Sequence, residues 1–248
     1  MASVVKSLAP PLALLILAAC GGGERIEGMS LSLGITTARS RGAPGPSGER
    51  TLVTDEGASA TLSGARVTLG SVELLPCEAT GWRRLWHALS PVGTAWAHTV
   101  SSATRLGTPH IIPLGDTDGE VLSLGVLRPA PGRYCRARLT FEPADDDAVG
   151  LVDPARDSDM VGLSLHVSGT VAGAGGAAPF DVKARGRSSV DVSLDGLELS
   201  EDAPQAARVF TLAWDLWLDG LAPGGSPGNL DLLGNVARSA SLQSSAVP

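Results

Sequence analysis

Residues 135–141 alternate apolar and polar side chains with a period of two. The apolar set is Cys135, Ala137, Leu139 and Phe141, and the polar set is Arg136, Arg138 and Thr140. Because successive side chains of a β-strand point to opposite faces, this pattern predicts a strand with one face in a core. Similar runs recur at 163–167, 180–184, 190–194 and 210–218, and no amphipathic helix pattern separates them. The chain is therefore predicted to be all-β.

The composition favours many short strands joined by turns. The sequence holds 31 Gly and 17 Pro, and only 4% of its residues are aromatic. About eight strands without crossover helices predict an antiparallel β-sandwich, immunoglobulin-like or transthyretin-like, with long loops. An open β-barrel is the alternative. The predicted core is Val67, Leu69, Val72, Leu74, Ile112, Leu122, Leu124, Ala137, Leu139, Phe141, Leu163, Leu165, Val167, Val192, Leu194, Phe210, Leu212, Trp214 and Leu216.

The first twenty residues resemble the leader of a bacterial lipoprotein. Lys6 precedes an apolar run, which ends at Leu17-Ala18-Ala19-Cys20 and is followed by three glycines. This run is too short for a transmembrane helix, which needs about 20 apolar residues. The resemblance to the lipobox implies a signal peptide at 1–19, cleavage before Cys20, diacylglycerol on the Cys20 sulfur and a palmitate-type acyl group on the new amino terminus. The alternative is an ordinary secretory signal.

Lipid on Cys20 would anchor the protein to a bacterial membrane, so the lipid bilayer is the one partner that the sequence predicts. Gly21, in place of Asp, resembles lipoproteins sorted to the outer membrane, facing the periplasm or the cell surface. Residues 20–64 are rich in Gly, Ser and Ala and are interpreted as a flexible tether. The sandwich is assigned to 65–221, and 222–248 is interpreted as a Gly/Pro/Ser-rich tail.

Charge and motifs argue against two functional classes. Without Lys6 the chain has 18 basic and 26 acidic residues and no basic patch, so nucleic-acid binding is not predicted. No H-E-x-x-H, C-x-x-C, S-x-x-K or G-x-S-x-G motif occurs, so the protein is predicted not to be an enzyme. The G-x-G-x-x-A run at 173–178 leads into an alternating strand pattern rather than a helix, which excludes a dinucleotide site. The protein partner stays unknown.

Three cysteines occur, and Cys20 is assigned to lipid. Cys77 and Cys135 remain in an exported chain, which favours a disulfide between them. The alternative is a pair of metal-binding thiolates, although their separation matches no compact metal motif.

Residues 79–110 contain three of the five Trp and three of the four His, and they are interpreted as a long loop. His87, His98 and His110 are 11 and 12 positions apart, so only folding of the loop could bring them together. Imidazole suits copper and zinc, and these three histidines are the candidate ligands. The alternative is that each lies separately at the surface.

Two local patterns make further predictions. In 67–74 the apolar residues stand at odd positions before Gly70-Ser71 and at even positions after it. This shift predicts two strands or one bulged strand. Residues 111–114 and 121–124 flank a polar, Gly-bounded loop and are interpreted as a hairpin. The acidic loop at 142–159 is interpreted as solvated, with a calcium site as the alternative.

Residues 66–218 resemble the MbnP-like proteins, which are exported and associated with copper. The resemblance lies in Gly132-Arg133-Tyr134, Arg138-Leu139-Thr140-Phe141, Val152-Asp153-Pro154, Asp159-Met160 and Gly169. It implies a metal-handling lipoprotein with copper as its cofactor, although no copper ligand of the family carries over residue by residue. A second class of β-sandwich lipoproteins, with a P-x-G-x-Y turn before the strand, fits equally well and implies no metal.

Overall fold

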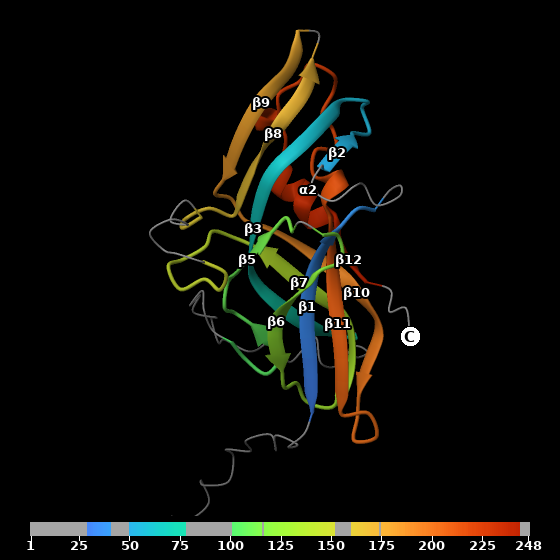
Figure 1. The fold of residues 1–248 in the computed structure, drawn as a ribbon. Coiled ribbons are helices and arrows are strands. Elements are labelled where there is room, and N and C mark those ends of the chain that lie inside the picture. The colour runs from blue at the N-terminus through green and yellow to red at the C-terminus, as the bar shows by residue number, and fades with distance from the viewer. Residues whose placement is uncertain are drawn as a thin grey trace, which may run out of the picture.

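Two β-sheets pack face to face in the computed structural model, and they do not close into a barrel (Figure 1). The structure describes residues 29–40, 50–77, 101–115, 117–151, 160–173 and 175–243. Within these ranges lie twelve strands and one α-helix. The predicted all-β sandwich is confirmed, and the open barrel is wrong. None of the helices in these ranges has the length and hydropathy needed to cross a membrane.

The smaller sheet has four strands in the order β12-β11-β1-β6. Its strands are β1 (Ser30–Ala38), β6 (Val121–Leu127), β11 (Gln205–Ala213) and β12 (Ala240–Leu242). β1 is central and pairs antiparallel with β6 but parallel with β11. The sandwich is therefore not purely antiparallel, because the first described strand inserts beside the last long one.

The larger sheet has eight strands, and five of them follow the order β10-β7-β3-β8-β9, while β2, β4 and β5 also pair with β3. Its strands are β2 (Arg50–Val53), β3 (Ser59–Pro76), β4 (Arg105–Leu106), β5 (His110–Pro113), β7 (Gly132–Phe141), β8 (Leu165–Gly173), β9 (Gly176–Ala184) and β10 (Ser188–Leu199). β3 has 18 residues and contacts every other strand of this sheet except β9 and β10.

β7 and β8 lie end to end along the same edge of β3. Leu69 pairs with Phe141 of β7 and with β5, and Val67 pairs with Leu165 of β8 and with β5. Because a strand residue has only two neighbours, β7 and β8 must both lie opposite β5. β10 and β9 continue this arrangement outward, since they pair with β7 and β8 respectively. Residues 142–164 are thus inserted in the sequence between two strands, β7 and β8, that pair with the same side of β3.

The junction between β7 and β8 contains a β-bulge and a buried carboxylate. The β3–β7 register shifts between Leu69 and Ser71, which leaves Gly70 as the extra residue. Glu142 is 6% exposed and occupies the space beside Gly70, where a Cβ atom would lie 2.3 Å from its side chain. Arg187 Nε lies 3.4 Å from Glu142 Oε2. The parity shift at 70–71 therefore marks one bulged strand.

The core lies between the two sheets and also uses segments outside the predicted domain. Every predicted core residue is buried except Leu122 and Leu216, which are half-buried. Leu216 differs because β11 ends at Ala213 and the chain continues as a 3₁₀ helix, η1 (Trp214–Leu216), so the strand alternation stops there.

The predicted boundaries of tether and tail are wrong. β1, β2 and the start of β3 lie within 20–64, and Met29 and Leu31 are fully buried core residues. Residues 222–248 contain η2 (Pro227–Asn229), α2 (Leu232–Arg238) and β12, and Val236 of α2 is 0% exposed. Apolar residues of both segments are buried in the core. The sandwich therefore begins before residue 65 and continues beyond residue 221.

The predicted hairpin of 111–124 is also wrong. β5 pairs with β3 in the larger sheet, whereas β6 pairs with β1 in the smaller one. The segment between β5 and β6 therefore crosses from one sheet to the other. Longer-range partners, namely Val67 for Ile112 and Ile35 for Leu122, set the register of these strands.

Candidate functional site

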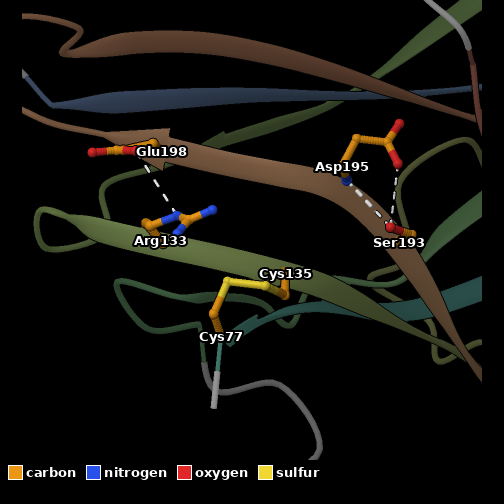
Figure 2. Close-up of a disulfide and its surroundings, with 6 residues drawn as sticks. All are labelled: Cys77, Arg133, Cys135, Ser193, Asp195 and Glu198. Atoms are coloured by element: carbon orange, nitrogen blue, oxygen red, sulfur yellow. Dashed lines mark hydrogen bonds and ion pairs between the residues drawn. A yellow bond between two sulfur atoms is a disulfide. The ribbon is translucent and has the colours of Figure 1, made fainter. Parts of the chain in front are cut away.

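The disulfide predicted between Cys77 and Cys135 is present, and it joins the end of β3 to β7 (Figure 2). The two Cα atoms are 4.7 Å apart, within the range that a disulfide spans. The Cys77 backbone N–H donates to the Arg133 carbonyl at 3.0 Å, which extends the β3–β7 pairing past Pro76. Both cysteines are half-buried. The covalent link therefore fastens the two strands together at the end of their hydrogen-bonded pairing.

Cys135 occupies an irregular position in β7. On β3, Leu75 pairs with Arg136 and Pro76 with Tyr134, so Cys135 is an extra residue on β7. Opposite it, the β10 register shifts between Ser193 and Leu197.

The irregular part of β10 forms a local turn at Asp195, whose φ is 53°, and Gly196. The Asp195 N–H donates to Ser193 Oγ at 3.2 Å, and the exposed Arg133 and Glu198 face each other at 3.9 Å (Figure 2). The bulge turns Cys135 away from the inward face predicted for it, because Tyr134 and Ala137 take the buried positions instead.

The structure describes only one of the three candidate metal ligands. His110 begins β5, and its Nδ1 lies 2.8 Å from the Thr108 carbonyl oxygen, which would leave Nε2 for a metal. His87 and His98 lie outside the described residues. Among the residues that the structure describes, no three His, Cys, Asp or Glu side chains gather as a metal site would require. The copper or zinc site stays a prediction.

A polar cluster that the sequence did not predict surrounds Asp118. Its Oδ1 accepts hydrogen bonds from Arg50 Nη1 at 2.6 Å and from Trp214 Nε1 at 3.0 Å. Its Oδ2 accepts one from the Arg39 backbone N–H at 3.0 Å. The guanidinium carbons of Arg39 and Arg50 lie 4.8 and 5.1 Å from the centre of the Trp214 ring, which is cation–π distance. These four residues are called the Asp118 cluster below.

The Asp118 cluster ties the two sheets together at one end of the sandwich. Arg39 follows β1 of the smaller sheet, Arg50 begins β2 of the larger one, Asp118 lies in the crossing segment and Trp214 begins η1. Arg39 and Arg50 also donate to the backbone carbonyls of Thr51 and Gly115 respectively. The arrangement satisfies a partly buried carboxylate with three donors, which indicates a structural role.

A small hollow adjoins the Asp118 cluster. Its volume is about 180 Å³, and its lining is Arg39, Thr51, Leu52, Val53 and Asp215. Asp215 is 6% exposed and accepts hydrogen bonds from the backbone N–H and the hydroxyl of Ser40, at 2.8 and 3.0 Å. Pockets for small molecules usually measure about 300–1,000 Å³, so this hollow is small for a ligand site.

The charge of Asp118 predicts a pH-dependent contribution to stability. Burial raises the pKa of Asp118, but hydrogen bonds from Arg50, Trp214 and the Arg39 backbone, with the charge of Arg50, lower it by more. An acid with a lower pKa in the folded state stabilises that state above its unfolded pKa, and the effect is lost as the pH falls through the folded value.

We expect Asp118→Asn to lower the free energy of unfolding by about 1–3 kcal/mol at pH 7, as for hydrogen bonds to charged groups. The loss should shrink as the pH falls below about 4, because the unfolded chain binds a proton at this carboxyl first and the folded protein does so only at a lower pH. Denaturant unfolding at pH 7 and pH 3 measures both values. Asp202→Asn, in an exposed turn, is the matched control and should change little. An equal loss at both pH values would contradict the electrostatic explanation.

A second acid–imidazole contact lies on the larger sheet. His166 Nε2 of β8 is 2.9 Å from Asp181 Oδ2 of β9, and the hydrogen bond with His166 lowers the pKa of Asp181. Asp181 is largely exposed, which makes this a cross-strand surface contact of a common kind.

Comparisons with protein-family models, with curated proteins and with solved structures find no match to this chain. The resemblances to lipoproteins and to MbnP-like proteins stay predictions from the sequence.

Proposed function

We propose that this protein is an exported lipoprotein, held on a bacterial membrane by acyl chains on Cys20, with a non-catalytic β-sandwich as its binding or structural module. The observation that carries the proposal is the pairing of the cysteines. Cys77 and Cys135 bond to each other, as in proteins of oxidising compartments. Cys20 is the remaining cysteine, and it stands at the acylated position of a lipobox.

The form of the domain supports a module that acts through its surface. Two sheets share one core, and the hollow beside Arg39 is smaller than the usual pocket for a small molecule. Gly21 after the acylated cysteine favours the outer membrane as the site of anchoring.

Mass spectrometry of the protein extracted from membranes tests the proposal. The expected mature chain begins at Cys20 and carries the mass of diacylglycerol and one further acyl group. Cys20→Ser should abolish acylation and leave an unanchored precursor, whereas Gly23→Ala, three positions later, should leave anchoring unchanged. A membrane-extracted chain with a free thiol at Cys20, or a mature chain that begins elsewhere, would refute the proposal.

A further inference from the structure

We propose that the bilayer lies against the end of the sandwich at which β1 begins, and that the opposite end points away from the membrane. The first end, called the tethered end, comprises Met29 and the turns at 128–131 and 200–204. The second, called the distal end, comprises the turn at 54–58 and Gly175, which lies between β8 and β9. The inference rests on the proposed acylation of Cys20.

The fold holds the chain firmly from Met29 onward. Met29 is 2% exposed within the main core, and the Ser30 N–H donates to the Pro204 carbonyl at 2.8 Å. β1 then lies between β6 and β11, so its first residues cannot leave without opening the smaller sheet. Any distance between membrane and domain must therefore be spanned by the residues before Met29.

Those residues are too few to let the domain turn over. Cys20 and Met29 are nine positions apart (29 minus 20), and nine fully extended residues reach about 30 Å. The tethered end and the distal end lie at opposite ends of β3, because Pro76 pairs with Tyr134 beside the tethered end and 54–58 precedes Ser59 (Figure 1).

β3 covers 17 steps (76 minus 59), or about 50 Å along its path once its two extra residues are discounted, Gly70 opposite β7 and Ser63 opposite β8. A domain that rested on its distal end would hold Met29 farther from the membrane than the connection can reach. The length of the connection therefore selects the tethered end as the one that faces the bilayer.

The described surface gives the domain little reason to lie flat. After removal of the leader the chain carries 18 basic and 26 acidic residues, which opposes contact with anionic lipid headgroups. The exposed large hydrophobic residues of the described ranges are few and divided among three segments, with Val53 on β2, Val121 and Val126 on β6, and Val149 and Val161 in the insertion. Within the part of the chain that the structure describes, these residues do not form a continuous apolar face of the kind that interfacial segments use.

Energy transfer to labelled lipids tests the orientation on the acylated, mature protein in vesicles. Ala203→Cys places a donor dye in an exposed turn of the tethered end. Gly175→Cys places the same dye at the distal end, where a new side chain would meet nothing within 4 Å. The native disulfide and the acylated Cys20 leave the new thiol as the labelled one. Transfer to headgroup acceptors from position 203 should exceed that from position 175 more than about three-fold.

Two controls keep the outcomes separate. Acyl mass and flotation with the vesicles are measured first, and their absence would refute the proposed function and the orientation with it. Equal transfer from both positions in protein that does float would overturn the orientation alone. Inserting twenty Gly/Ser residues after Gly23 should bring the two values closer, because the connection then exceeds the length of β3. An unchanged ratio after this insertion would also overturn the inference.

Discussion

Replacing Cys77 and Cys135 together by alanine is expected to lower the free energy of unfolding by about 4 kcal/mol. The disulfide closes a loop with a sequence separation of 58, and loop closure of this length accounts for most of that value. Both cysteines are half-buried, so the smaller side chains should leave little cavity. Guanidinium unfolding of the chain from Gly21 onward, monitored by tryptophan fluorescence, measures the change.

The reducing agent provides the matched control for this prediction. Reduction should destabilise the wild-type chain by about as much as the double substitution does. The same agent should leave the alanine variant unchanged, because no disulfide remains there. A wild-type unfolding midpoint that reduction does not move would mean that the disulfide contributes no stability.

The strands that the sequence predicted well are those with one face in the core. In β7, β8 and β10 the buried positions repeat with a period of about two, and their apolar residues reveal it. β1 was missed because six of its nine residues are buried, including Thr36 at 1% and Thr37 at 5% exposed. A central strand that is covered on both faces does not alternate between apolar and polar residues. Buried threonines also make such a strand look more polar in the sequence than its environment is.

The hairpin error has a different physical origin. The Gly-bounded turn at 115–120 is a genuine turn signal, but a local pattern cannot reveal that the flanking strands join different sheets. β5 is held by Val67, more than forty positions earlier, and β6 by Ile35, more than eighty positions earlier. The register of β5 and β6 is set by burial against these partners. The partners lie far outside the short stretch of sequence from which a hairpin is recognised.

The Asp118 cluster could not be predicted for the same reason. Its hydrogen bonds join residues 68, 79 and 96 positions apart. Asp118 follows Asp116 in a polar run that resembles any solvated loop, and Arg39 and Arg50 stand in the stretch interpreted as a tether. The disulfide was predictable although its ends are 58 positions apart, because only two cysteines remained once Cys20 was assigned to lipid.

Gly169→Ala is expected to lower the free energy of unfolding by about 3 kcal/mol, the upper end of the range for overpacking. Gly169 lies in β8 between Leu62 of β3 and Phe180 of β9. A Cβ atom there would lie 2.1 Å from the Thr61 carbonyl oxygen and 3.0 Å from Cζ of Phe180. The first contact is with backbone, so no side-chain rotation relieves it, and β8 must move away from β3.

Gly175→Ala is the matched control, since a Cβ atom there has no neighbour within 4 Å. Its effect should stay within about 0.5 kcal/mol in the same denaturant unfolding experiment. A third variant separates the two contacts of Gly169, because Phe180→Leu removes the ring but leaves the Thr61 carbonyl in place. Gly169→Ala should remain destabilising in that background. If Phe180→Leu restores stability to Gly169→Ala, the aromatic ring and not the β3 backbone sets the requirement for glycine.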